Sequence, residues 1–291
     1  MNTVKAREKE IIRRAQEQMP WVRMEPVTVR KNNGQKHEGI CVSEPGKNIS
    51  VVIYWSSIWA DCGKSDTDEE TVTCLCRMAQ EELAVQIKYE SLSDWQEAKH
   101  MVHKKVVNYA RNTKRLRGKA YRKYLDLVEI YCLKISVPGR GDGLAEISRK
   151  QLKGWGVSIK ELEKQAAAHM DFEDYEILPM EELLAGFGFE VERPDPMMYV
   201  LCRKDKDYAA DAMTSPAFMK QFAARAGGDC YILPASVFEL IAVPCRKGVD
   251  AVQLQKMVQE VNRDAVAPED FLSDSVYYCH ADSGEVELCC V

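Results

Sequence analysis

Several features that assign a protein to a class are missing from this sequence of 291 residues. No apolar run approaches the roughly 20 residues that a membrane-spanning helix needs. The first 18 residues carry charges throughout, whereas a secretory signal needs an apolar core. None of the eleven cysteines forms a C-x-x-C pair, which argues against a zinc knuckle or a thioredoxin-type redox site. We therefore expect a cytoplasmic protein with reduced thiols and no membrane partner.

Motifs of cofactor and metal binding are equally scarce. Gly139, Gly141 and Gly143 follow a predicted strand, but no Lys-Ser/Thr pair and no predicted helix follows them, so they are expected to form a turn rather than a phosphate loop. The carboxylates from Asp66 to Glu70 lack the glycine and the spaced oxygens of a calcium loop. The five histidines are scattered. The sequence therefore predicts no metal and no cofactor.

The order of the predicted elements mixes strands and helices. Two strand-like runs, 22–30 and 39–43, flank the segment KNNG at 31–34, and Asn-Gly favours a hairpin because both residues tolerate positive φ. Helices are predicted behind the capping boxes that begin at Thr67 and Ser158. Since strict β-α-β alternation is absent, we predict an α+β fold with mixed or antiparallel sheets and helices packed on them.

Three regions are predicted along the chain: an N-terminal region of helix, hairpin and helix at 1–92, a middle α/β region at 93–192 and a C-terminal α+β region at 193–291. Strand, turn, strand and capped helix over 127–170 recur in that order over 229–263. This order suits two similar strand–strand–helix halves, but it is also a common arrangement without duplication.

A helix is predicted at the start of the middle region. Its apolar stripe consists of Trp95, Ala98, Val102, Val106 and Tyr109, which recur at helical spacing.

The segment from Lys99 to Lys123 is the strongest physical anomaly, with ten Lys or Arg and no acid in a chain of net charge −5. A positive stripe on an acidic body would attract phosphates. The alternative is a solvated face that pairs with acidic side chains of the same protein or another subunit. The candidate nucleic-acid-binding residues are Lys104, Lys105, Arg111, Lys114, Arg115, Arg117, Lys119, Arg122 and Lys123.

A succession of short motifs resembles one protein family. It runs from KNNG at 31–34 through Asn108-x-x-x-Asn112 and LDL at 125–127 to ILPAS at 232–236 and LSDSVY at 272–277. The succession resembles a family of uncharacterised bacterial proteins, a domain of unknown function met in gut anaerobes and mobile elements. The resemblance covers most of the chain and implies an intracellular α+β protein. It supplies no activity.

The sequence departs from the pattern of this family within the fourth motif and just after it. The family usually has ILPSS followed by a hydrophobic residue and His-Glu, whereas Ala235 and Phe238 stand here at the serine and histidine positions, and Glu239 is retained. If that histidine were a general base, this chain lacks it.

Three residues are weak candidates for catalysis. Asp126 lies within an apolar strand, where a carboxylate must be paired, protonated or solvated; we favour an ion pair at the strand start over a role as acid, base or metal ligand. Ser236 and Glu239 follow a strand without a nearby histidine and without a G-x-S-x-G elbow. A serine after a proline-terminated strand more often bonds to local backbone.

These observations favour a non-catalytic binding or regulatory protein that acts on a protein partner of unknown identity. The first alternative is a nucleic-acid-associated protein that uses Lys99–Lys123. The second is a hydrolase that uses Asp126, Ser236 and Glu239, for which the fold must bring these side chains into one pocket.

Overall fold

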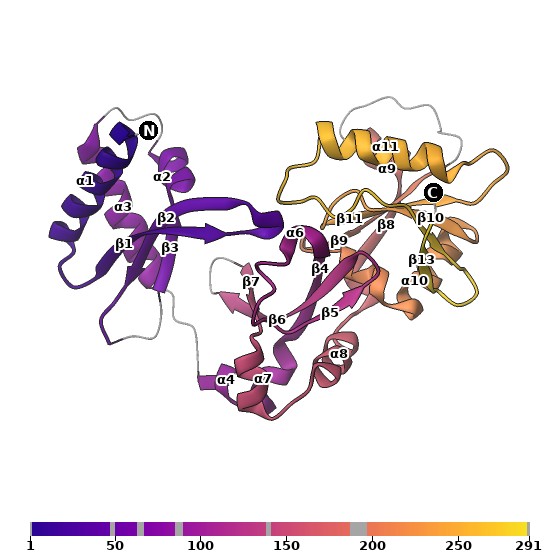
Figure 1. Ribbon diagram of the computed structural model, residues 1–291, viewed down its shortest axis with the longest axis horizontal. Coiled ribbons are helices and arrows are strands. Elements are labelled where there is room, and N and C mark those ends of the chain that lie inside the picture. The colour runs from indigo at the N-terminus through magenta and orange to yellow at the C-terminus, as the bar shows by residue number, and fades with distance from the viewer. Residues whose placement is uncertain are drawn as a thin grey trace. The chain divides into compact units, whose positions relative to one another are not determined.

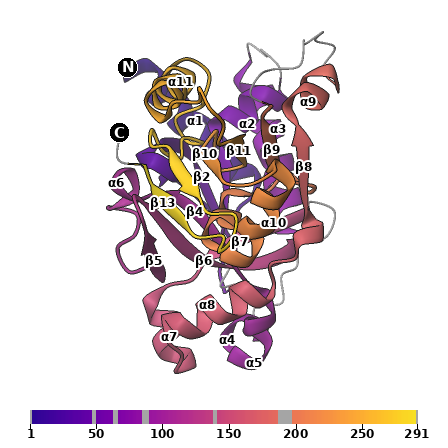
Figure 2. The ribbon, with the colours of Figure 1, turned by 90° about the vertical axis from the view of Figure 1, so that its right-hand side faces the viewer.

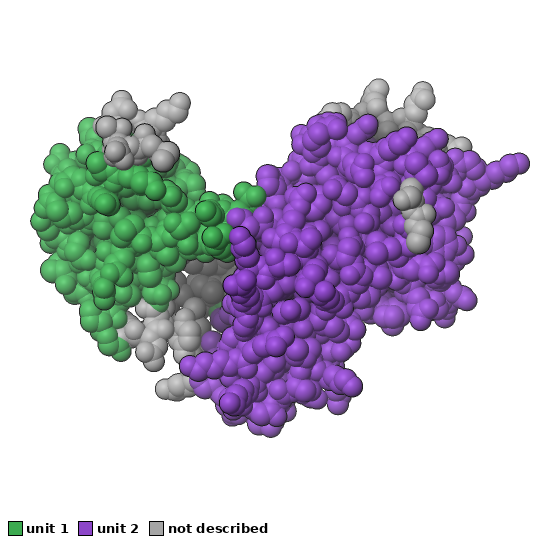
Figure 3. Space-filling view, viewed as in Figure 1, with its two compact units in different colours: residues 1–31, 35–88, 136–141 green, residues 32–34, 89–135, 142–291 purple. Residues whose placement is uncertain are grey.

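The computed structural model describes residues 2–46, 50–62, 67–84, 90–137, 141–186 and 197–289. These form two compact units, drawn as ribbons in Figure 1 and in space-filling form in Figure 3. Unit 1 comprises residues 1–31, 35–88 and 136–141, and unit 2 comprises residues 32–34, 89–135 and 142–291. The predicted α+β class is confirmed, because helices pack on antiparallel sheets. None of the helices in these ranges is long and apolar enough to cross a bilayer.

Unit 1 contains a three-stranded antiparallel sheet in the order β1-β2-β3. Alternate strand residues such as Ile40 meet Ile11 and Leu75 of two helices in one core. The predicted helix cap at Thr67 is present, since the Thr67 hydroxyl accepts a hydrogen bond from the Glu70 amide. The elements are α1 (Asn2–Gln18), β1 (Arg23–Arg30), β2 (Lys36–Ser43), β3 (Ser50–Tyr54), α2 (Trp55–Asp61) and α3 (Asp68–Leu83).

The predicted hairpin is confirmed, and its tip is the short 3-10 turn η1 (Asn32–Gly34). Asn33 and Gly34 have φ values of 54° and 75°, in the left-handed region that asparagine and glycine tolerate best. Unlike the two strands that it joins, this tip belongs to unit 2.

The first sheet of unit 2 has the order β4-β6-β5, with β7 also paired to β6. Its apolar face packs on helices through Leu133, Ile147, Leu152 and Leu162. The predicted cap at Ser158 is present. The strands are β4 (Val102–Asn108), β5 (Tyr121–Tyr124), β6 (Leu127–Val137) and β7 (Gly141–Glu146); the helices and turns of this part are α4 (Glu90–Ser93), α5 (Trp95–Ala98), η2 (Lys99–Met101), α6 (Tyr109–Asn112), α7 (Arg149–Trp155) and α8 (Ile159–Ala168).

The second sheet of unit 2 has six strands in the order β13-β12-β10-β11-β9-β8. Its elements are η3 (Phe172–Asp174), β8 (Tyr175–Pro179), α9 (Met180–Gly186), β9 (Tyr199–Arg203), η4 (Ala210–Thr214), α10 (Pro216–Ala226), β10 (Cys230–Leu233), β11 (Glu239–Pro244), α11 (Ala251–Asp264), β12 (Tyr277–Cys279) and β13 (Val286–Leu288).

Helices α10 and α11 cover opposite faces of this sheet, as Figure 2 shows. Ile232 of β10 packs with Phe222 of α10, whereas the next residue, Leu233, packs with Leu254 and Val258 of α11. This alternation follows from the period of two in a strand.

The middle and C-terminal regions predicted from the sequence share one core within unit 2. Val106 and Ile130 of the first sheet pack in the same cluster as Phe222 and Leu240 of the second. Strand, strand and helix do recur over 127–170 and 229–263, although two helices end the first segment and one ends the second. Duplication stays a prediction.

The helix predicted over 95–109 is confirmed only at its start, in α5, and is wrong for 102–108, which forms the strand β4. The spacing of four between Ala98, Val102 and Val106 places residues on one side of a helix, but four is also an even number and places them on one side of a strand. Nearly every residue of β4 is buried, so no polar alternation marks the strand in the sequence.

Candidate functional site

Asparagine side chains from three separate parts of unit 2 hold one loop that follows α11. We call residues 268–273 the clasped loop. Each amide nitrogen donates to a backbone carbonyl oxygen that accepts no hydrogen bond within a strand or helix. The bonds run from Asn33 to Pro268 (3.0 Å) and Phe271 (2.7 Å), from Asn32 to Glu269 (2.6 Å), from Asn108 to Leu272 (2.9 Å) and from Asn262 to Ser273 (2.9 Å).

The hairpin tip is fixed in turn by a further asparagine. Asn112 accepts from the Asn33 backbone amide at 3.0 Å and donates to the Asn33 side-chain oxygen at 2.9 Å. Its own amide also donates to the Asn108 carbonyl at 2.8 Å. The first, second and last of the motifs that carried the family resemblance therefore meet at the clasped loop. The sequence gives no sign of this pairing, because the partners lie up to 238 positions apart.

Asp126 joins the same assembly from the start of β6. Leu125 has φ of 53°, and the carboxylate of the following Asp126 accepts bonds from Ser273 (2.6 Å), Tyr277 (2.7 Å) and Ser275 (3.3 Å). The predicted ion pair is corrected by this geometry: hydroxyl groups, and no Lys or Arg among the described residues, are the partners. Burial and the adjacent carboxylate raise the pKa of Tyr277.

Replacing Asp126 by alanine is expected to lower the free energy of unfolding by about 2 kcal/mol, because the buried Ser273 and Tyr277 hydroxyls lose their acceptor. Asp126→Asn keeps one acceptor oxygen and should lose less. Urea denaturation of both variants and the wild type measures this difference. Equal stability of Asp126→Ala and wild type would contradict a structural role for the carboxylate.

Ser236 and Glu239 form a separate local turn. The Ser236 hydroxyl accepts from the Phe238 amide at 3.0 Å, and the Ser236 amide donates to the Glu239 carbonyl at 3.2 Å. The Glu239 side chain is exposed. Among the described residues no hydrogen bond joins Asp126, Ser236 or Glu239 to another of the three through their side chains. This geometry gives the hydrolase hypothesis no support.

The histidines that could have served such a site lie elsewhere. His169 Nδ1 lies 2.8 Å from the Val102 carbonyl oxygen, and its ring stacks on His103. His280 lies 3.3 Å from Glu287. Burial lowers the pKa of His103. Within the ranges that the structure describes, which omit Asp66 and Gly139, no three His, Cys, Asp or Glu side chains are grouped to hold a metal ion.

About half of the basic segment is turned toward buried carboxylates. Lys104 is 8% exposed and pairs with Glu129 at 2.9 Å, and Lys105 is 4% exposed and pairs with Glu146 at 3.0 Å. Arg122 also bonds to Glu129, and both Arg115 and Lys119 pair with Glu146. Lys104 and Lys105 are therefore closed to a phosphate in this structure, which corrects their place among the candidate nucleic-acid residues.

These ion pairs decide the protonation of the two carboxylates. Burial by itself would raise the pKa of Glu129, but Arg122 and Lys104 lower it overall. Lys105 and Arg115 have the same effect on the pKa of Glu146. The pairing predicted as the alternative to phosphate binding is thus present on one side of the segment.

Four other cations of the segment face outward. Arg111, Lys114, Arg117 and Lys123 are exposed, and none forms an ion pair with any residue in the described part of the chain. Lys123 lies 3.9 Å from the centre of the Tyr109 ring. A pocket of about 310 Å³ opens here, lined by Tyr109, Thr113, Leu116, Arg117, Gly118, Tyr121 and Arg149. We call it the tyrosine pocket.

A second pocket of unit 2, of about 480 Å³, lies beside the clasped loop and is called here the loop pocket. The guanidinium carbon of Arg111 lies 3.4 Å from the centre of the Phe271 ring on its wall. The lining residues are Arg111, Gln259, Asn262, Arg263, Val266, Pro268, Phe271 and Asp274.

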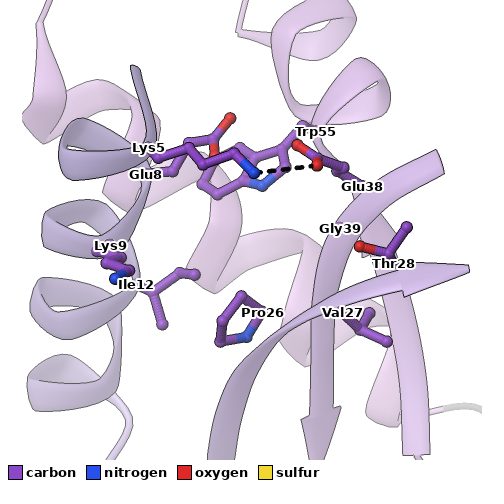
Figure 4. Close-up of a pocket in the computed structure, with 10 residues that line it drawn as sticks. All are labelled: Lys5, Glu8, Lys9, Ile12, Pro26, Val27, Thr28, Glu38, Gly39 and Trp55. Atoms are coloured by element: carbon purple, nitrogen blue, oxygen red, sulfur yellow. Dashed lines mark ion pairs between the residues drawn. The ribbon is translucent and has the colours of Figure 1, made fainter. Parts of the chain in front are cut away.

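Unit 1 has a pocket of about 340 Å³ between α1 and the β1–β2 hairpin, shown in Figure 4. Its walls carry Lys5, Glu8 and Lys9 on the helix and Glu38 and Trp55 opposite. Lys5 and Glu38 approach to 3.6 Å across it. Burial and Glu38 raise the pKa of Glu8. Charges of both signs already compensate each other here, so the walls select no class of ligand.

Comparison with known proteins identifies one family model that matches residues 4–280. Its description is a family of unknown function (DUF5688). No curated protein and no solved structure matches the chain.

Proposed function

Because the chain belongs to the DUF5688 family, whose function is unknown, its role has to be inferred from its own surface, and we propose that it binds single-stranded nucleic acid at the tyrosine pocket without catalysing a reaction. This proposal adopts the non-catalytic role favoured by the sequence and selects nucleic acid as the partner.

The observation that carries the proposal is the meeting of two acid-free segments. Residues 98–125 and 147–160 contain no Asp or Glu. They are joined where Lys119 bridges Ser148 and where the Arg149 amide donates to the Gly118 carbonyl at 2.8 Å. The exposed cations Arg117, Lys123 and Arg149 line the tyrosine pocket or lie over the ring of Tyr109 and form what we call the cationic face; none of them is paired with a described carboxylate. Such a face attracts a phosphate backbone.

The ion-paired cations of the same segment add to the positive potential. Three cations, Lys105, Arg115 and Lys119, pair with the single carboxylate of Glu146. One carboxylate cannot neutralise three cations, so an excess of positive charge remains at Arg115 and Lys119, on either side of Arg117 in the sequence. A bound phosphate would offset part of this excess.

The tyrosines favour single strands over duplexes. Tyr109 and Tyr121 are half-buried and line the pocket together with Arg117 and Arg149. Unstacked bases can lie on aromatic rings, which contributes roughly 1–3 kcal/mol per base. A base pair in a duplex cannot enter such a pocket without unstacking.

A fluorescein-labelled thymidine 20-mer titrated with the full chain should show binding that weakens steeply with salt. Arg117→Glu and Arg149→Glu should each lower the affinity about tenfold and reduce the salt slope by about 0.7 for each phosphate that is no longer neutralised. Fluorescence anisotropy at several salt concentrations measures both quantities.

Charge reversal at Lys220, which is exposed on α10 and belongs neither to the acid-free segments nor to the pocket lining, is the matched control and should leave the affinity nearly unchanged. The proposal is contradicted if the oligonucleotide does not bind at low salt. It is also contradicted if Lys220→Glu loses as much affinity as Arg117→Glu and Arg149→Glu. Tighter binding of a duplex of the same length contradicts the assigned role of the tyrosines.

A further inference from the structure

The loop pocket carries an unpaired charge of each sign on its walls. Arg111 and Asp274 both line it, yet neither forms an ion pair with any residue that the structure describes. A pocket of about 480 Å³ lies within the size range of small-molecule sites. Two opposite charges that share a pocket without pairing are complementary to a ligand that carries both.

Arg111 is prepared to receive a carboxylate. Its guanidinium lies against the buried ring of Phe271, a cation–π interaction that restricts its orientation. No side-chain hydrogen bond of the guanidinium to a described residue is present, so its N–H edges remain available. A planar guanidinium binds a carboxylate through two parallel bonds, and holding it in place beforehand reduces the entropic cost of binding.

Asp274 supplies the negative charge of the loop pocket. One of its oxygens accepts from Asn262 at 2.9 Å, and the same asparagine amide holds the Ser273 carbonyl of the clasped loop. The other oxygen has no partner among the described residues. A carboxylate oriented in this way can accept hydrogen bonds from an ammonium group.

We propose that the loop pocket binds a free α-amino acid with an apolar side chain. The α-carboxylate pairs with Arg111, the α-ammonium pairs with Asp274, and the side chain lies against Val266, Pro268 and Phe271. An anion without the ammonium would be repelled by Asp274, and a cation without the carboxylate would be repelled by Arg111. This site is separate from the cationic face and does not rest on nucleic-acid binding.

Three probes of one shape test the pairing of charges: L-leucine carries both, leucinamide keeps only the ammonium, and 4-methylpentanoate keeps only the carboxylate. Titration calorimetry on the full chain should show saturable binding of leucine, with both analogues weaker by about tenfold or more, since a hydrogen bond to a charged group contributes about that factor. Amide chemical shifts should move in the clasped loop.

Arg111→Gln and Asp274→Asn should each weaken leucine binding about tenfold, whereas Lys114→Gln, a neighbouring exposed cation outside the pocket, should not. Thermal unfolding of each variant establishes that it is folded. The proposal is overturned if leucine does not bind, if 4-methylpentanoate or leucinamide binds as tightly, or if Lys114→Gln weakens binding equally. None of these results depends on the oligonucleotide titration.

Discussion

Glu129→Gln is expected to lower the free energy of unfolding by about 3 kcal/mol, because it leaves the buried Lys104 without its counter-charge inside unit 2. Glu129 is fully buried on β6 and pairs with Lys104 and Arg122. Lys104 is buried as well, so water cannot replace the missing carboxylate. Hydrogen exchange of the β6 amides during urea titration would report the destabilisation within unit 2 itself.

Glu163 provides a matched control, because it pairs with the same Arg122 at 3.1 Å but is 40% exposed. Glu163→Gln should cost less than about 1 kcal/mol, as expected for a solvated ion pair. A double variant with methionine at both Lys104 and Glu129 should recover much of the stability that Glu129→Gln removes, since the buried charge is then absent. Similar destabilisation in Glu129→Gln and Glu163→Gln would contradict the burial argument.

Asp211→Asn is expected to stabilise the protein at neutral pH and to leave it unchanged in acid. Asp211 is 7% exposed, and burial raises its pKa from 3.8 to about 6, against the opposing effects of Lys104 and the Tyr175 hydroxyl. Between those pH values the folded chain holds a proton that the unfolded chain has released. Stability therefore falls as pH rises through this window and stays lower above it.

Asparagine removes the cost of ionising this buried group, so the variant should exceed the wild type by up to about 3 kcal/mol at pH 7. Unfolding curves at pH 3.5, 5 and 7 measure the difference. For Asp205→Asn the stability difference from the wild type should change with pH in the opposite direction. Hydrogen bonds from Arg203 and Lys134 lower the pKa of Asp205, so the variant should be less stable than the wild type at pH 7 and approach it in acid. If the free energies of unfolding of the wild type and Asp211→Asn differ by the same amount at every pH, the raised pKa of Asp211 is contradicted.

The local parts of the fold could be predicted from the sequence, because short-range chemistry determines them. The Asn-Gly turn, the capping residues Thr67 and Ser158, and Asp250 at the start of α11 act on neighbours within a few positions. The strand β4 could not be recognised, because burial on both faces removed the polar alternation that distinguishes a strand from a helix.

The candidate sites were predicted less well, for a reason that also concerns distance along the chain. Ten cations in one segment suggested a uniform positive stripe, yet Glu129 and Glu146 neutralise part of it from strands that only the fold brings near. Arg149 of the cationic face lies outside the basic segment and was missed for the same reason. The acid-free run that contains it, 147–160, was visible in the sequence and would have been the available signal.

The placement of the hairpin tip has a practical consequence for dissecting the protein. A fragment that begins after residue 88 would contain nearly all of unit 2 but would lack Asn32 and Asn33. Three carbonyls of the 268–271 stretch and the Asn112 side chain would then each lose a hydrogen bond at once. Truncation at the apparent boundary would thus yield a destabilised product, and the first third of the gene must be co-expressed, or the tip supplied as a peptide, for the remainder to fold fully.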